Sequence, residues 1–393
     1  MTAHNDALAA AMDRARSLVP VLAERARRAE ELRRIPDETI ADLHAAGLLR
    51  ILQPRRTGGL ELEYDAIVRI TAMLARGCGS TAWVVANLAN HAFMLALWPR
   101  EAQDEIWGPD PHALIGSALM FPPGHATRVA GGYRLSGRWK FSSGIDACTW
   151  TMLGGIASAD GELPDYRVFL LPASDYRIVD TWHAAGLRAT GSNDIEIEDA
   201  FVPQHRALSV ELMKGCSAPG SAVNPGPLYR LPVFDMFPYV VAATALGIAQ
   251  GAVDQFTEDT RHRVTSYTST LLADHATTQA RLGEAAAAVA TAELVLLENC
   301  SLAMAAAADT RVPSREEKIR LRRDGAYAAR LCTRAVDLLF EAGGGEFLYD
   351  AQVMQRSFRD VHAAQSHYAL AWDVAASMAG KFMLGIAPDL PTL

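Results

Sequence analysis

The chain has 393 residues, and its 37 lysines and arginines against 45 aspartates and glutamates give a net charge of −8. Half of the residues are hydrophobic and 21% are charged, which excludes disorder as the main state of the chain. The acidic balance argues against a nucleic-acid partner, because phosphate binding needs clustered lysine and arginine. The five cysteines are odd in number and widely spaced, so the sequence predicts no metal site and favours the reducing cytoplasm.

Residues 1–112 are predicted to form a helical domain. Apolar residues recur every three or four positions from Leu8 to Ala26, and Pro36 with two acidic residues opens a second helix that ends at Gly47. Further helices are expected at 63–76 and 80–98. Residues 77–99 carry no formal charge, a length that could cross a bilayer. Their polar side chains favour a buried helix instead, so we expect no membrane span.

Residues 113–215 are predicted to form a β domain, because glycine and proline become frequent and short β-rich runs appear between turn signals. The expected strands are 113–120, 132–136, 150–156, 166–171 and 194–202.

Residues 216–393 return to helix after a loop at 215–232 that is rich in glycine, proline and serine. Four long alanine-rich segments have lengths that suit a four-helix bundle: 234–260, 275–308, 314–341 and 359–384. The fold class is therefore mostly α with a central β domain.

Common catalytic motifs are absent from the sequence. It has no HExxH zinc motif, no phosphate-binding Walker loop and no GxSxG nucleophile elbow. Residues 77–82 fit GxGxxA by letter, but they follow a helix instead of a strand. If the protein performs redox chemistry, we therefore expect it to lack a Rossmann domain for a nicotinamide.

One expected helix carries an unusual set of side chains. Aromatic rings, asparagines and a histidine share one broad face at helical spacing, which is typical of a pocket for a flat, partly polar molecule. A core helix with satisfied polar groups is the alternative, and composition favours neither. The residues are Trp83, Asn87, Asn90, His91, Met94 and Trp98.

Three further clusters are candidates for function. Residues 137–144 combine aromatic rings with two hydroxyls, and residues 187–192 add further hydroxyls and backbone donors; capping turns are the alternative. Residues 356–368 carry His362 and His367, and histidine suits proton transfer near neutral pH.

These segments together resemble the acyl-CoA dehydrogenase superfamily along the whole chain. Residues 185–192, Ala-Gly-Leu-Arg-Ala-Thr-Gly-Ser, running into 195–203, are the strongest match. Residues 137–144 are similar to the family's flavin-contacting strand, and Arg359-Asp360 to its late Arg-Asp pair. The resemblance implies an N-terminal helical domain, a middle β-barrel domain and a C-terminal four-helix bundle. It also implies a flavin between the β domain and the bundle of a homotetramer.

The sequence departs from the dehydrogenases at their catalytic base. Most of them carry a glutamate about nine positions after the Arg-Asp pair, whereas residues 365–369 contain no carboxylate here. His367, residues 141–144 and the helix with Trp83 and His91 look instead like flavin-dependent two-component monooxygenases. The resemblance is to their oxygenase components, among them the 4-hydroxyphenylacetate and steroid-phenol hydroxylases.

That branch implies an activity and its partners. Reduced FMN, with FAD as the alternative, would arrive from a separate reductase and react with O₂ to a C4a-hydroperoxide. The hydroperoxide would hydroxylate a small phenolic or polycyclic aromatic substrate. N- or S-oxygenation and an acyl-CoA dehydrogenase activity are the alternatives, and the substrate and the choice between dimer and tetramer stay open.

The resemblance also implies residue roles. Ser143 matches the hydroxyl near flavin N5, His367 would assist formation of the hydroperoxide, and His91 would accept the phenolic proton. The implied substrate contacts are His91, Ser117, Asn87 and Tyr368. The implied flavin contacts are Trp83, Phe141, Ser142, Ser143, Arg188, Thr190, Ser192, Arg261, Arg263 and His367; either Arg261 or Arg263 would reach the phosphate end.

Overall fold

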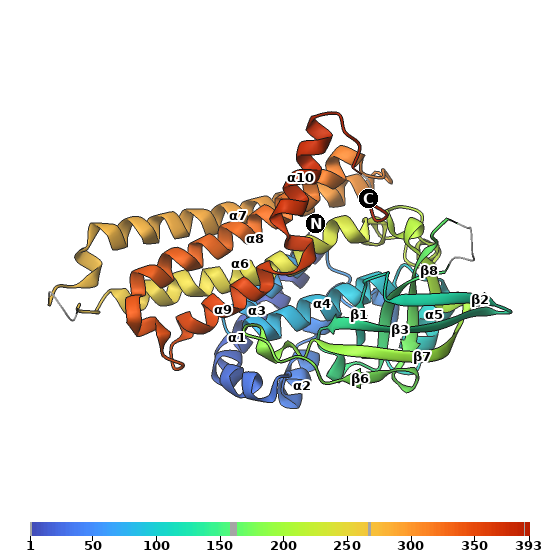
Figure 1. Ribbon diagram of the computed structural model, residues 1–393, viewed down its shortest axis with the longest axis horizontal. Helices are drawn as coiled ribbons and strands as arrows, with labels where there is room; N and C mark the ends of the chain where they lie inside the picture. The colour runs from blue at the N-terminus through green and yellow to red at the C-terminus, as the bar shows by residue number, and fades with distance from the viewer. Residues whose placement is uncertain (1, 158–162, 266–268, 389) are drawn as a thin grey trace.

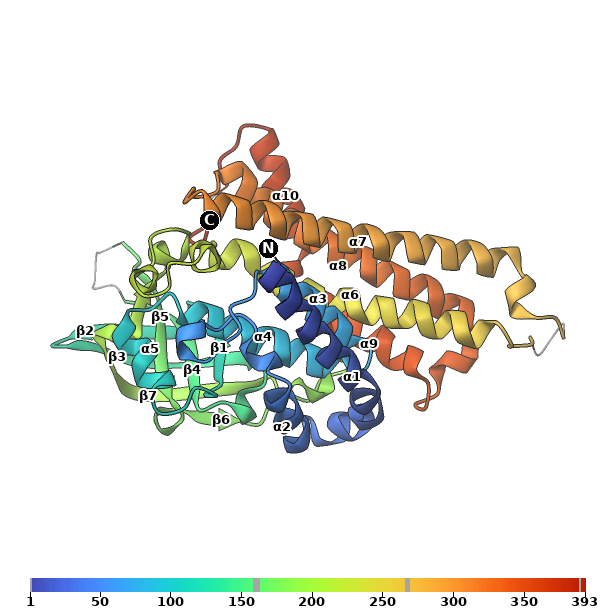
Figure 2. The ribbon, with the colours of Figure 1, turned by 180° about the vertical axis from the view of Figure 1, so that it is seen from behind.

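A computed structural model describes residues 2–157, 163–265, 269–388 and 390–393. The sheet lies at one end of the molecule, and three long helices extend from it to the other end (Figure 1). The N-terminal helices lie against the junction of these two parts, as the view from behind shows (Figure 2). The order helical, β, helical is therefore confirmed, while the domain boundaries at 112 and 215 stay a prediction.

The N-terminal helices match the apolar periodicity of the sequence. Gly47 follows the second helix with φ of 70°, a left-handed conformation that glycine adopts without strain. Every residue of the fourth helix is buried, so the uncharged segment is a core helix of the protein. The helices are α1 (Thr2–Leu32), α2 (Asp37–Ala45), α3 (Asp65–Ala75), α4 (Gly79–Leu95) and α5 (Arg100–Trp107).

The β domain forms one mixed sheet of eight strands in the order β6-β7-β3-β2-β4-β5-β8, with β1 beside β4. The resemblance implied a barrel, but the end strands β6 and β8 are not paired with each other in the described part of the chain. Three short strands, β2, β6 and β8, were not expected from the sequence. The strands are β1 (Ile115–Ala118), β2 (Gly124–Val129), β3 (Gly132–Ser142), β4 (Trp150–Ile156), β5 (Tyr166–Pro172), β6 (Arg177–Val179), β7 (Asn193–Pro203) and β8 (Ala207–Ser209).

The C-terminal region begins with three helices close to their expected bounds, α6 (Val233–Thr260), α7 (Ala276–Ala308) and α8 (Arg315–Gly343). The expectation of one fourth helix over 359–384 is wrong. The chain forms α9 (Val353–Gln365), a single 3₁₀ turn and then α10 (Trp372–Met383). The break is stabilised locally, because the His367 side chain accepts a hydrogen bond from the amide of Ala369.

Two helices, α6 and α7, are long and apolar enough to cross a membrane by length and composition. The apolar part of α6 is 78% buried inside the protein, which accounts for its composition. The corresponding part of α7 is only 33% buried, and Leu294 and Leu302 are exposed on it. α7 therefore presents an apolar face that its own chain does not cover.

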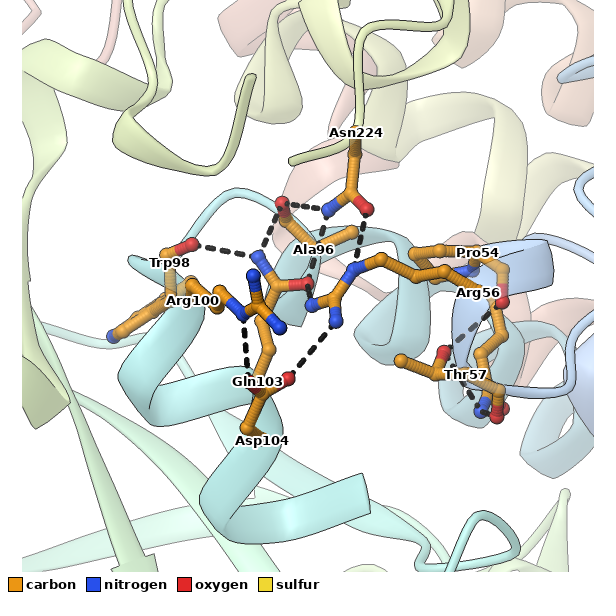
Figure 3. A network of polar contacts seen from close by, with 10 residues as sticks. Pro54, Arg56, Thr57, Ala96, Trp98, Arg100, Gln103, Asp104 and Asn224 are labelled. Atoms are coloured by element: carbon orange, nitrogen blue, oxygen red, sulfur yellow. Dashed lines mark hydrogen bonds and ion pairs between the residues drawn. The ribbon is translucent and has the colours of Figure 1, made fainter. Parts of the chain in front are cut away.

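The loop at 215–232 is fastened to the C-terminal end of α4 by a polar network (Figure 3). Asn224 donates to the carbonyl of Ala96 over 2.8 Å and to Gln103 over 3.0 Å. Arg56 donates to Asn224 over 3.1 Å and also to Gln103 and Asp104. The network fixes the end of the helix that carries His91.

Candidate functional site

The site is built around α4, which begins at Gly79 after an extended Cys78 and packs against α3, α6 and β1. Its two ends carry two separate polar clusters, one at Trp83 and one at His91. These residues are two turns apart, which corresponds to about 12 Å along the helix axis.

The first cluster is a chain of hydrogen bonds from Trp83 into the β domain. The indole Nε1 of Trp83 donates to Ser143 Oγ over 3.0 Å, and Ser143 Oγ lies 2.8 Å from Ser192 Oγ. Ser192 Oγ lies 2.6 Å from Thr190 Oγ1, which donates to the carbonyl of Leu187 over 3.0 Å. The structure thus brings together four of the expected flavin contacts.

The end of β3 shapes the surface beside this cluster. A register shift between Trp139 and Ser142 marks a bulge, and Phe141 adopts a φ of 67°. Bulges and strained backbone conformations of this kind gather at functional sites. The Phe141 ring is 58% exposed, whereas Ser142 Oγ is buried and has no hydrogen-bond partner within the described residues.

Asp360 of α9 anchors the loop that carries Thr190 and Ser192. Its Oδ1 accepts a hydrogen bond from the amide of Leu187 over 2.6 Å. The backbone of Arg359 lies so close to Gly186 that a Cβ there would approach its carbonyl oxygen to 2.0 Å. Burial raises the pKa of Asp360 to about 6, while the Leu187 hydrogen bond acts in the opposite direction. The late Arg-Asp pair therefore connects the bundle to the first cluster.

His367 lies in the turn between α9 and α10, where its ring contacts those of Trp83 and Phe237. Nδ1 accepts the amide hydrogen of Ala369, so the neutral imidazole carries its proton on Nε2. Desolvation lowers the pKa of His367 to about 4, which makes the ring a neutral hydrogen-bond donor at pH 7. Its neighbour Tyr368 is 68% exposed within the single chain.

The second cluster pairs His91 with Ser117 of β1. The imidazole Nδ1 donates to the carbonyl of Ile115 over 2.7 Å, so Nε2 accepts the hydroxyl hydrogen of Ser117 over 2.7 Å. Burial lowers the pKa of His91 to about 4, although the Ile115 hydrogen bond acts in the opposite direction. Ser117 is the more exposed member of the pair.

The polar and aromatic side chains on one face of α4 bond to different parts of the protein. Asn87 donates to the carbonyl of Trp83 in its own helix, and Asn90 accepts from the buried hydroxyl of Tyr64. Trp98 donates to the carbonyl of Arg206. Three members of the face thus bond to other parts of the protein, while Trp83 and His91 belong to the two clusters; the substrate contact expected at Asn87 stays a prediction.

The expected arginines lie in different places. Arg188 is exposed beside the first cluster and has no hydrogen bond or ion pair within the residues that the structure describes. Arg261 pairs with Glu258, and Arg263 donates to the carbonyl of Gly343. Both follow the far end of α6, which at 1.5 Å per residue is about 36 Å from Phe237. Within one chain neither meets the first cluster.

Sequence reasoning missed two buried contacts that hold α4 in place. The amide of Ala189 donates to Ser80 Oγ over 3.3 Å, and Tyr64 of the segment before α3 donates to Asn90 over 3.0 Å. Both partners are far apart in sequence, so no local pattern could have shown these contacts. The one signal in the sequence was the presence of a tyrosine shortly before a helix with polar side chains, because a tyrosine hydroxyl usually finds a hydrogen-bond partner when it is buried.

The first cluster fits a flavin ring by its chemistry. A flat ring with polar edges finds an exposed aromatic residue at Phe141, a partly exposed hydroxyl at Ser143 and an Nε2–H on His367, whereas Ser142 is fully buried and faces Gly116. Among the described residues no group of three or more His, Cys, Asp or Glu side chains could hold a metal ion.

Comparisons with known proteins agree with this chemistry. The family models for the N-terminal and C-terminal domains of acyl-CoA dehydrogenase match residues 6–111 and 239–372. The chain is 37% identical over 95% of its length to the flavin-dependent monooxygenase oxygenase subunit HsaA of Mycobacterium tuberculosis, covering 94% of that protein. It is 32% identical over 97% of its length to the p-hydroxyphenylacetate 3-hydroxylase oxygenase component of Acinetobacter baumannii, covering 90% of it. XiaF from Streptomyces, solved with FADH₂ and glycerol, superposes with a TM-score of 0.93 at 30% identity, over 100% of this chain and 99% of that one.

Proposed function

This chain belongs to the acyl-CoA dehydrogenase family, among its flavin-dependent monooxygenases, and from that premise we propose that it hydroxylates a phenol bound beside Ser117. It is the oxygenase component of a two-component system that uses reduced flavin and O₂ on an aromatic substrate. The observation that supports phenol hydroxylation is the His91–Ser117 pair, two turns along α4 from the flavin-binding cluster.

The residues of the first cluster would hold the cofactor. Bound reduced flavin supplies the two electrons with which O₂ is activated. Ser143 would bind the polar edge of the ring and Phe141 its face, while His367 would direct its Nε2–H to the same region. Trp83 and Phe237 would keep water out. We propose FMN as the preferred flavin. FAD is the alternative, because XiaF was solved with FADH₂.

His91 would accept the substrate's proton through Ser117. The phenol O–H donates to Ser117 Oγ, the Ser117 hydrogen moves to His91 Nε2, and the resulting phenolate ring is richer in electrons at its carbons. The carbonyl of Ile115 then stabilises the imidazolium by accepting from Nδ1. No titratable side chain other than His91 is needed for this transfer.

A second copy of the chain would complete the site in a homotetramer. Two observations support this proposal: the apolar face of α7, and the position of Arg261 and Arg263 about 36 Å from Phe237. Only another copy could bring these arginines to the phosphate end of a flavin.

The five cysteines are free thiols, which supports a cytoplasmic location.

The experiment supplies chemically reduced FMN or FAD anaerobically and then admits ¹⁸O₂ in the presence of a phenol, an aromatic amine or a thioether. We expect a hydroxylated phenol that carries one ¹⁸O atom, without any reductase in the mixture. Oxygen transfer to the amine or the thioether alone would replace ring hydroxylation by N- or S-oxygenation. Oxidised flavin and hydrogen peroxide with every substrate would contradict the proposal.

A further inference from the structure

Three hydroxyls of the first cluster form an unbranched row of hydrogen bonds, here called the hydroxyl chain, which ends at a backbone carbonyl. Ser143 Oγ, Ser192 Oγ and Thr190 Oγ1 follow one another at 2.8 and 2.6 Å, and Thr190 reaches the carbonyl of Leu187 over 3.0 Å. Only Ser143 is partly exposed, whereas Thr190 and Ser192 are 1% and 4% exposed. A ligand therefore meets this chain at Ser143.

The carbonyl of Leu187 sets the direction of the whole chain. A carbonyl oxygen accepts hydrogen bonds and cannot donate, so the proton in the 3.0 Å contact belongs to Thr190. If Thr190 turned away, two acceptor oxygens would face each other at that distance. Because Thr190 has one proton, Ser192 must donate to Thr190, and by the same reasoning Ser143 must donate to Ser192.

The carbonyl is held in place by other contacts. It also accepts from Trp182 Nε1 over 3.0 Å and from the amide of Thr190 over 3.1 Å, and the amide of Leu187 itself is bound by Asp360. The Leu187 carbonyl is therefore held against Thr190 Oγ1, and a reversed Thr190 hydroxyl would leave these two acceptor oxygens facing each other.

The direction leaves Ser143 as an acceptor towards any ligand. Its single proton is used on Ser192, and one of its two lone pairs accepts the indole hydrogen of Trp83. Because Ser143 is partly exposed, its remaining lone pair is available to a ligand. Reduced flavin carries a hydrogen on N5 and can donate to that lone pair, whereas N5 of oxidised flavin only accepts.

We propose that Thr190 and Ser192 make this site selective for reduced over oxidised flavin by fixing Ser143 as a hydrogen-bond acceptor. The inference rests on the proposed function, in which Ser143 binds the N5 edge. Oxidised flavin could gain the same hydrogen bond only if Ser143 gave up its bond to Ser192, which would leave two acceptor oxygens 2.8 Å apart, or if all three hydroxyls reversed and left Thr190 Oγ1 against the Leu187 carbonyl. An oxygenase that takes reduced flavin from a separate protein needs this preference in order to release the oxidised product. Thr190 and Ser192 are positioning residues, since they act through Ser143.

The test measures two dissociation constants for the full-length protein, one for reduced FMN under anaerobic conditions and one for oxidised FMN. We expect the wild type to bind reduced FMN more tightly. Thr190→Val and Ser192→Ala should each lower the ratio of the oxidised to the reduced constant by about tenfold, the contribution of one hydrogen bond. Thr181→Val is the matched control. The Thr181 hydroxyl donates to Asp194 and is not part of the row of three hydroxyls, so this variant should keep the wild-type ratio.

The outcomes separate this inference from the proposed function. A general loosening of the site would weaken both constants together and leave their ratio unchanged. If the wild type prefers reduced FMN and both variants keep that ratio, the inference is overturned while the proposed function stands. If the wild type does not bind reduced FMN at all, the proposed function itself fails.

Discussion

The two polar clusters along α4 differ in the kind of chemistry that they support. At Trp83 three hydroxyls and an indole N–H have fixed directions, and none of these groups titrates near neutral pH. At His91 a neutral imidazole offers an acceptor nitrogen to Ser117, and burial lowers its pKa to about 4. The two clusters, for which we propose cofactor orientation and proton acceptance, thus lie about 12 Å apart along one helix.

The clusters also depend on different parts of the chain. The Trp83 cluster is anchored from the bundle, because Asp360 of α9 holds Leu187. The His91 cluster is closed by Ile115 and Ser117 of the neighbouring strand. Substitutions in the bundle should therefore disturb cofactor binding first, and substitutions in β1 should disturb substrate chemistry.

His91→Ala provides the strongest test of this separation. Loss of the proton acceptor should reduce hydroxylated product about 10²–10⁴-fold, while the affinity for reduced FMN stays unchanged. Hydrogen peroxide should then account for the oxygen consumed. Product, peroxide and flavin titrations measure the three quantities, and normal product yield would remove His91 from the mechanism.

The depressed pKa of His91 predicts the pH dependence of stability. The unfolded chain binds a proton at His91 below about pH 6.5, whereas the folded protein does so only near pH 4. Stability is therefore complete above pH 6.5 and falls by about 3 kcal/mol as the pH drops to 4. His91→Gln should lose this part of the slope in urea unfolding curves at several pH values; parallel curves for the two proteins would contradict the assignment.

Asp360 tests the anchoring of the Trp83 cluster. Asp360→Ala leaves the buried amide of Leu187 without its acceptor, which should cost about 1–3 kcal/mol in the free energy of unfolding and weaken reduced FMN binding. Asp360→Asn keeps a carbonyl acceptor and should retain both properties. Because the raised pKa of Asp360 disfavours its charge at pH 7, the asparagine variant should also be at least as stable there. Equal flavin affinities for the alanine and asparagine variants would show that the contact between Asp360 and Leu187 does not affect cofactor binding.

Arg261 and Arg263 should have the smallest effect, since each would be an exposed or partly exposed partner of a phosphate. Arg261→Gln or Arg263→Gln should weaken FMN binding by about two- to fivefold. Riboflavin lacks the phosphate, so its affinity should not change. An identical loss for FMN and riboflavin would indicate a structural effect instead of a phosphate contact.

Local patterns predicted the regular elements well. The apolar spacing, Pro36 and Gly47 placed the N-terminal helices, and the strand at 150–156 was expected at its observed bounds. The break before α10 was missed because no glycine or proline marks it. It depends on the His367 side chain capping Ala369, which is a choice between helix and turn that propensity does not decide.

The candidate site was less accessible to local reasoning. Resemblance indicated Ser143, Thr190, Ser192 and His91, but the direction of the hydroxyl chain depends on distances that only the folded protein shows. The polar face of α4 was expected to line one pocket because periodicity indicates which residues share a face. Periodicity does not indicate which neighbouring group each polar side chain bonds to. Asn90, for example, accepts a hydrogen bond from Tyr64.

The contact between Leu187 and Asp360 joins residues 173 positions apart in the chain. Closing so long a loop is entropically expensive and slow, so this contact should form late during folding. The cofactor region would then mature only after the bundle has docked onto the sheet. The time at which flavin affinity appears during refolding would therefore report when the bundle docks onto the sheet.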